Sequence, residues 1–67
     1  MQAIAWVDLG DAVFIADDFE YVTKKRDDLG PAGMKSTVRL RSGHWFYTRL
    51  GPRGVVAKIQ AALEARP

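Results

Sequence analysis

The stretch "STVRLRSGHWFYTRLG", residues 36–51, decides the fold because it holds the clearest β-hairpin of the chain. Apolar and polar residues alternate on both sides of Ser42-Gly43, which predicts antiparallel strands at 36–41 and 44–50. The length of the turn fixes the register of this hairpin. A shift of one residue would move every side chain of a strand to the opposite face of the sheet.

Two turn lengths are compatible with the sequence. A two-residue turn, Ser42-Gly43, would place Trp45 and Tyr47 in the core beside Val38. A three-residue turn, which begins at Arg41, would turn both aromatic side chains outward. The longer turn is favoured because Ser42 would need a positive φ in the shorter one, whereas Gly43 adopts a positive φ readily. It predicts an inner face of Val38, Leu40, His44, Phe46, Thr48 and Leu50, and an outer face of Arg39, Trp45, Tyr47 and Arg49.

The outer face has two interpretations. Tryptophan in a small domain is more often partly buried than displayed, which favours the shorter turn and an aromatic core. Alternating cations and aromatic rings on an open sheet are instead typical of a binding surface. The burial of tryptophan is the commoner case, so the aromatic core is placed ahead of the binding surface, which stays open as the alternative. The candidate binding residues are Arg39, Arg41, Trp45, Tyr47 and Arg49, and a secondary basic patch would consist of Lys24, Lys25, Arg26 and Lys35.

The rest of the chain predicts further strands and one helix. Gly10-Asp11 suits a two-residue hairpin turn that starts with glycine. Strict alternation places Phe19 and Tyr21 on one face of their strand and Val22 on the other. The predicted elements are strands at 2–9, 12–16 and 19–25, a loop at 26–35 that is the best candidate for a mobile segment, and a helix at 52–65.

The helix begins with Pro52, a residue that suits the first helical position. Apolar residues recur at helical spacing in Val55, Val56, Ile59, Ala62 and Leu63, and this stripe should face the core. Strands followed by one helix indicate a single α+β domain over residues 1–67. We expect an antiparallel four- or five-stranded sheet with one C-terminal helix packed on one face.

Length and composition restrict how this domain is stabilised and where it resides. A chain of 67 residues buries only about 60% of the surface of its unfolded form, so the core is thin. No cysteine is present, which excludes disulfides and thiolate metal sites. The longest apolar runs are far shorter than a membrane span, and the N-terminal segment lacks the basic region of a signal peptide. These features predict a cytoplasmic protein without a membrane partner.

Charge is distributed unevenly along the chain. Residues 1–23 contain five acids and no lysine or arginine, a net charge of −5, whereas residues 24–67 contain ten bases and three acids, a net charge of +7. If the fold separates these segments, the domain is an electrical dipole that steers partners. If strands from the two segments lie side by side, the charges neutralise each other instead.

No motif predicts catalysis or a cofactor. His44 is the only imidazole, and it is expected at the surface beside the hairpin turn. The acids at 17–20 and 27–28 lack the spaced ligands of a calcium loop. The loop at 30–33 lacks the lysine and the following helix of a phosphate-binding loop. We therefore expect no enzyme activity, no cofactor and no metal.

The segment "TVRLRSGHWFYTRLGPRGVVAKIQAAL" resembles the small flagellar FlbD-like proteins, in a similarity that spans residues 36–63. It has the same order of strand, glycine turn, strand and short helix. The chain has Ser42-Gly43 where that family tends to have Asn-Gly, and Asp17-Asp18 near the place of an upstream Asn-Pro. The resemblance implies a small non-enzymatic accessory protein.

The sequence as a whole predicts a small non-enzymatic binding or regulatory module. Its partner would be another protein or a second copy of the same chain, because a thin core and an open sheet face suit association. The alternative is single-stranded nucleic-acid binding through the basic-aromatic hairpin 36–50. In that case Trp45 and Tyr47 would stack on bases while arginines hold phosphates.

Overall fold

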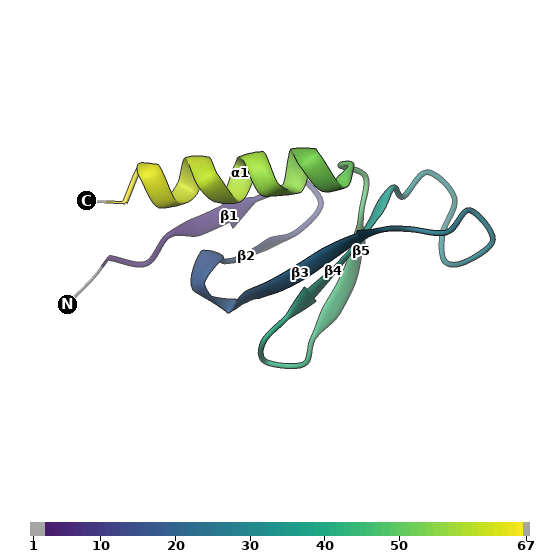
Figure 1. Cartoon of the computed structure of the whole chain (residues 1–67), viewed down its shortest axis with the longest axis horizontal. Coiled ribbons are helices and arrows are strands. Elements are labelled where there is room, and N and C mark those ends of the chain that lie inside the picture. The colour runs from purple at the N-terminus through teal and green to yellow at the C-terminus, as the bar shows by residue number, and fades with distance from the viewer. Residues whose placement is uncertain (1–2, 67) are drawn as a thin grey trace.

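The computed structural model describes residues 3–66, which form two antiparallel sheets and one helix (Figure 1). Gln2, where the first strand was predicted to begin, lies outside the described residues. The first sheet pairs β1 (Trp6–Asp8) with β2 (Val13–Ile15). A 3-10 turn, η1 (Ala16–Asp18), leads into the second sheet, which has the order β3 (Phe19–Lys24), β4 (Ser36–Leu40), β5 (Trp45–Thr48). The helix α1 (Pro52–Glu64) follows.

The prediction of one four- or five-stranded sheet is therefore wrong, although the α+β class and the single C-terminal helix are confirmed. The strands separate at Asp17-Asp18. These residues form η1 rather than a tight hairpin turn, so β3 leaves at an angle and pairs only with β4. The first hairpin packs its inner face against the second sheet and α1 instead of extending a sheet edge.

Phe14 on β2 joins the two sheets. Its ring lies 6.4 Å from the ring of Phe19 on β3 and 5.7 Å from the ring of Phe46 on β5. Around it lies one buried cluster to which both sheets and the helix contribute. The cluster consists of Ala5, Val7, Leu9, Phe14, Ala16, Val38, Leu40, Val55 and Ile59.

The second hairpin closes with the three-residue turn. Val38 lies opposite Phe46, Arg39 lies opposite Trp45, and the N–H of Leu40 donates to the carbonyl of His44 at 2.8 Å. Gly43 has φ +98°, the positive value that this turn requires. The preferred register is confirmed, and the shorter turn with an aromatic core is wrong.

A β-bulge at Glu20 changes the faces of β3. Phe19 pairs with Leu40, but Tyr21 pairs with Arg39, so one extra residue is inserted. Phe19 and Val22 consequently both pack against the core, whereas Tyr21 is exposed. The prediction that Phe19 and Tyr21 share a face is wrong, because strict alternation does not pass through a bulge.

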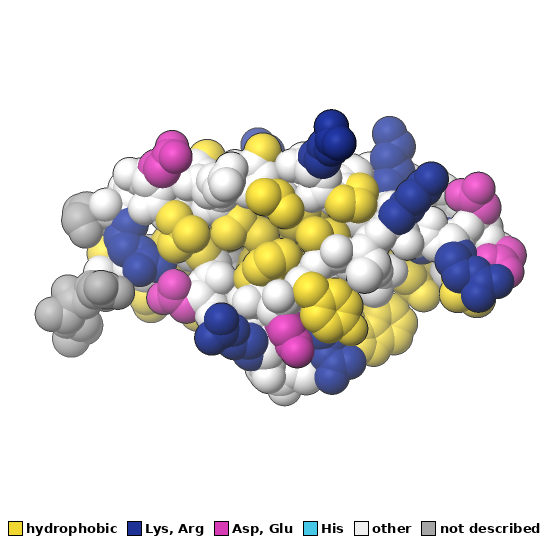
Figure 2. All heavy atoms as spheres, in the orientation of Figure 1, with side chains coloured by type: hydrophobic (Ala, Val, Ile, Leu, Met, Phe, Trp, Pro, Cys, Tyr) yellow, Lys and Arg dark blue, Asp and Glu magenta, His cyan; other side chains and the backbone are white. Residues whose placement is uncertain are grey.

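The helix buries a narrower stripe than its sequence predicts. Val55 and Ile59 are buried, but Val56 and Leu63 are exposed, since α1 packs mainly on β1, β3 and η1. Figure 2 shows hydrophobic side chains gathered between α1 and the three-stranded sheet.

Within residues 3–66, no helix combines the length and the apolar character that a membrane span needs.

The acidic and basic segments interleave in space. Asp17 pairs with Arg66 at 2.9 Å, and the carboxylate of Asp18 accepts from the backbone N–H and hydroxyl of Ser42. Asp11 at the tip of the first hairpin accepts from the Thr48 hydroxyl at 2.7 Å and from the Arg49 N–H at 2.8 Å. These contacts tie the first hairpin and η1 to the second half of the chain. The acidic residues of the first segment thus form contacts that stabilise the fold, and the two segments are not separated into opposite poles of charge.

Asp11 should make stability depend on pH. Desolvation raises its pKa, but hydrogen bonds from Arg49 and Thr48 and the charge of Arg49 outweigh that effect, so the pKa lies below 3.8. A carboxyl whose folded pKa is lowered stabilises the protein above its unfolded pKa, and this contribution is lost as the pH falls through the folded value. We expect Asp11→Asn to melt at a lower temperature than wild type at pH 7, and the difference to shrink below pH 3.8.

Thermal melts at pH 7 and pH 2 test this expectation. Asp27→Asn is the control, because Asp27 is exposed and makes no hydrogen bond or ion pair within the described residues. An Asp11→Asn variant that melts like Asp27→Asn at every pH would contradict the role of this carboxylate.

Candidate functional site

The outer face of the three-stranded sheet carries an aromatic surface with one cation at its centre. We call this surface the aromatic platform, and it surrounds a shallow depression of about 330 Å³. Its residues come from all three strands and from the loop between β3 and β4. They are Tyr21, Leu29, Thr37, Arg39, Trp45 and Tyr47.

Strand pairing sets the order of the platform. Arg39 on β4 has Tyr21 opposite it on β3 and Trp45 opposite it on β5, so the three side chains form a row across the sheet. Trp45 is 55% exposed, and its ring meets that of Tyr47 edge to face, with centroids 5.2 Å apart. Large aromatic side chains are thus exposed next to a guanidinium.

Arg39 has an unsatisfied hydrogen-bonding group. Its Nε is buried and has no hydrogen-bond partner in the described part of the chain. The nearest carboxylate oxygen belongs to Glu20 and lies 3.9 Å from Nε, too far for a hydrogen bond. The side chain as a whole is 42% exposed, so part of it is open to solvent although Nε is buried.

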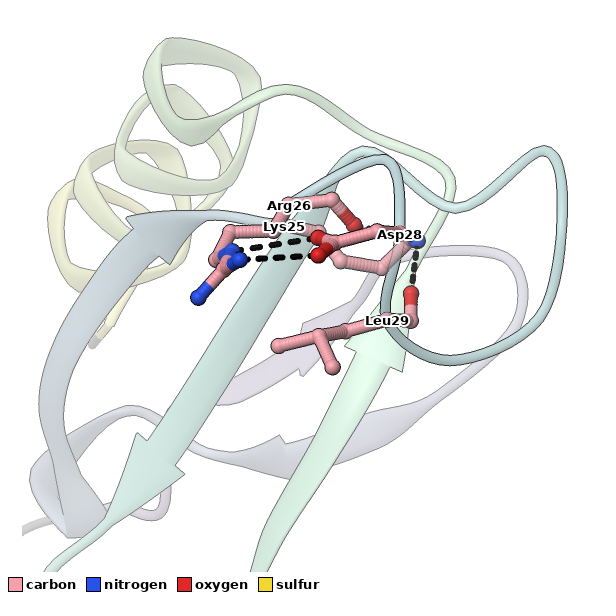
Figure 3. Close-up of polar contacts among 4 residues, drawn as sticks. All are labelled: Lys25, Arg26, Asp28 and Leu29. Atoms are coloured by element: carbon pink, nitrogen blue, oxygen red, sulfur yellow. Dashed lines mark hydrogen bonds and ion pairs between the residues drawn. The ribbon is translucent and has the colours of Figure 1, made fainter.

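Lys25 holds the loop that forms one wall of the platform (Figure 3). Only 6% of this residue is exposed, and its Nζ donates to the carbonyls of Arg26 and Leu29. The ammonium also lies 5.9 Å from the centroid of the Tyr47 ring. Arg26 and Asp28 form a bidentate ion pair on the same loop, in which Nε donates to Oδ1 at 3.1 Å and Nη2 donates to Oδ2 at 2.8 Å. These contacts lie in the part of the loop next to β3, and Leu29 from this loop lines the depression of the platform.

The residues of the predicted secondary basic patch line two neighbouring hollows. Lys24, Lys25 and Arg26 line one of them with Asp27 and Asp28, and Lys24, Lys25 and Lys35 line the other with Asp27 and Pro52. Lys25 itself is buried, because its ammonium donates to loop carbonyls, and Arg26 is paired with Asp28. The ammonium of Lys25 is therefore already engaged within the loop.

The five predicted hairpin residues are brought together in part. Arg39, Trp45 and Tyr47 line the depression. Arg41 lies in the turn after β4, and Arg49 directly follows β5, so both are exposed at opposite ends of the hairpin and neither lines the depression.

Three platform residues were missed by sequence reasoning. The bulge hides Tyr21, because strict alternation assigns it to the face of Phe19. Leu29 carried a usable signal, since it is the only large aliphatic side chain in the charged segment 26–30. Thr37 alternates with Val38 on β4 and could have been placed by the register alone.

Two further apolar surfaces lie elsewhere. A shallow groove of about 370 Å³ between β3 and α1 is lined by Val22, Pro52, Arg53, Val56, Ala57 and Gln60. On the first sheet, Trp6 lies opposite Ile15, and Ile4 and Val13 extend the same outer face. We call these four residues the hairpin patch; Trp6 is 59% exposed.

No group of three or more histidine or acidic side chains in the range 3–66 is placed to hold an ion. His44 is exposed, and its Nδ1 lies 3.1 Å from the Ser42 hydroxyl beside the turn.

Gly30 brings the loop backbone against Tyr47, and its replacement should displace this ring. A Cβ at Gly30 would lie 2.7 Å from Cζ of Tyr47, whereas a Cβ at Gly33 would meet nothing within 4 Å. Both glycines have positive φ, so alanine at either position should cost about 1–3 kcal/mol of stability. Only Gly30→Ala should also alter the near-ultraviolet circular dichroism of the Trp45–Tyr47 pair. Identical spectra for Gly30→Ala and Gly33→Ala would contradict this contact.

Comparison with known proteins gives no relative from which a role can be transferred. No family model, curated protein or solved structure matches this chain. The resemblance of residues 36–63 to the flagellar proteins therefore stays a prediction.

Proposed function

We propose that this chain is a small, non-enzymatic cytoplasmic binding module that contacts another protein through the aromatic platform. The observation that carries the proposal is the exposure of Trp45 beside Tyr47 and Arg39 on the outer face of the three-stranded sheet. Tryptophan, tyrosine and arginine are the residue types enriched at the energetic centres of protein interfaces. Burial of a large ring such as that of Trp45 under a partner contributes a large favourable free energy to binding.

One feature favours a protein over a nucleic acid at this surface. Leu29 adds an aliphatic wall that offers no stacking plane. Single-stranded nucleic acid remains the second candidate because of the Trp45–Tyr47 pair. In that case these rings would stack on bases and Arg39, Arg41 and Arg49 would hold phosphates.

Selection of a displayed random 12-residue peptide library tests the proposal. Wild type should enrich peptides that Trp45→Ala no longer binds. Trp6→Ala is the matched control, because Trp6 is equally exposed but lies on the other sheet. Both variants should stay folded, since losing the contact between Trp45 and Tyr47 costs only about 0.5–1.5 kcal/mol. If no enriched peptide depends on Trp45, or if a random single-stranded oligonucleotide binds in its place, the protein-binding proposal fails.

Self-association is a third candidate function, and the hairpin patch favours it. Ile4, Trp6, Val13 and Ile15 make both faces of the first hairpin apolar, a pattern typical of strands covered on both sides. Asp8 is the only charged residue of β1 and β2, so two copies would meet there with little repulsion. Light scattering should then show an oligomer that Trp6→Ala abolishes and Trp45→Ala retains. A monomer at both low and high salt would contradict it.

A further inference from the structure

Arg39 is the chemical centre of the aromatic platform. It stands between Tyr21 and Trp45 in the row across the sheet, and it is the only charged side chain that lines the depression. A hydrogen bond from this guanidinium to a charged acceptor is stronger than one between neutral groups. Strand pairing fixes the backbone position from which the side chain projects.

The hydrogen bonds of Arg39 within the chain are incomplete. Nε is buried without an acceptor, and the Glu20 carboxylate stays at 3.9 Å. A guanidinium offers five donors in a planar fork that matches a carboxylate with two parallel hydrogen bonds. The exposed part of this side chain can therefore accept a ligand carboxylate.

We propose that the aromatic platform binds an acidic segment of a partner protein, with a carboxylate on Arg39 and a neighbouring apolar side chain in the depression. This inference rests on the proposed function and specifies the chemistry of the partner. Trp45, Tyr47 and Leu29 form the apolar walls, and the volume of about 330 Å³ accommodates one or two side chains. A peptide that combines both features matches the platform better than a uniformly charged ligand.

The charges at the ends of the hairpin agree with an acidic partner. Arg41 lies at the turn end and Arg49 at the opposite end, with Arg39 between them. Four or five strand residues separate the two ends, a distance of about 13–17 Å. An extended segment of about five residues would span it. Acidic side chains along that segment would approach all three arginines.

Two pools of synthetic hexapeptides test the inference. Both pools carry the same randomised apolar residues at alternate positions, and the remaining positions are glutamate in one pool and glutamine in the other. Binding is followed by amide chemical shifts of β4 and β5. We expect the glutamate pool to bind wild type about tenfold or more tightly than the glutamine pool, because only carboxylates form charge-assisted bonds with Arg39. Salt should weaken this preference.

Variants of Arg39 complete the test. Arg39→Gln should remove the preference for glutamate, and Arg39→Lys should retain part of it, since lysine keeps the charge but lacks the fork. Arg53→Gln is the control, because Arg53 is exposed on α1. Circular dichroism confirms folding, and Arg39→Lys serves as the variant if Arg39→Gln does not fold.

The outcomes separate the two proposals. Equal binding of both pools that still depends on Trp45 would overturn the carboxylate inference and leave the protein-binding function intact. Preference for a single-stranded oligonucleotide that depends on Arg39 and Trp45 would overturn both in favour of a phosphate ligand. Binding of neither pool to wild type would also overturn the inference.

Discussion

Phe14→Ala should unfold a large fraction of the protein at room temperature. Removing a buried phenylalanine costs about 3–5 kcal/mol, because the transfer free energy of the ring is lost and a cavity remains. A domain of this length has a total stability of about 3–10 kcal/mol. One substitution can thus consume most of the free energy of unfolding.

The position of Phe14 makes the upper part of that range the expected one. Only 5% of the residue is exposed, and its ring packs against Phe19 and Phe46 of the other sheet. Among residues 3–66, no strand of one sheet pairs with a strand of the other, and Asp11 accepts hydrogen bonds from Thr48 and Arg49 at the tip of the first hairpin. The cavity would therefore open where side-chain packing is the main link between them.

Val13→Ala is the matched control for this prediction. Val13 precedes Phe14 on β2 but points to the opposite face and is 59% exposed. Urea denaturation should show a clearly lower midpoint for Phe14→Ala and a small change for Val13→Ala. Similar midpoints for the two variants would mean that Phe14 does not join the sheets.

The second hairpin could be predicted from sequence because its turn has a strong local requirement. Ser42 disfavours the shorter turn and Gly43 suits the longer one, so the register and the outward direction of Trp45 follow from backbone conformation. The same logic identified the Gly10-Asp11 turn. The N–H of Leu9 donates to the carbonyl of Ala12 across it, and Gly10 has φ +89°.

The separation of the two sheets could not be predicted in this way. It depends on how Asp17-Asp18 redirect the chain and on the packing of Phe14 against distant rings, and neither is visible in a periodic pattern. The bulge at Glu20 also leaves no signal in the sequence of β3, since it is a mismatch between two strands rather than a property of one. This bulge places Tyr21 opposite Arg39, in the aromatic platform.

Lysine burial is a further case in which the sequence is ambiguous. Lys24, Lys25 and Arg26 are consecutive cations in a strand end and a loop, so composition alone treats them alike. The structure separates them by the acceptors that each can reach. Only Lys25 meets two loop carbonyls, and this makes it a structural residue of the platform wall.

Lys25→Met should destabilise the protein by about 1–3 kcal/mol, because the Leu29 carbonyl loses its donor where water does not replace it, whereas the Arg26 carbonyl still accepts from the Leu29 N–H at 3.2 Å. Methionine keeps the apolar stem, so the loss reports the ammonium rather than packing. Lys24→Met is the matched control, since it removes the same charge from an exposed neighbour. Urea denaturation measures stability, and hydrogen exchange of residues 26–35 should become faster only in Lys25→Met.

Because the ammonium also faces the Tyr47 ring and holds Leu29, Lys25→Met should weaken peptide binding to the platform as well. Equal stability and equal exchange in the two variants would show that the loop, and with it the platform wall, is held by other contacts.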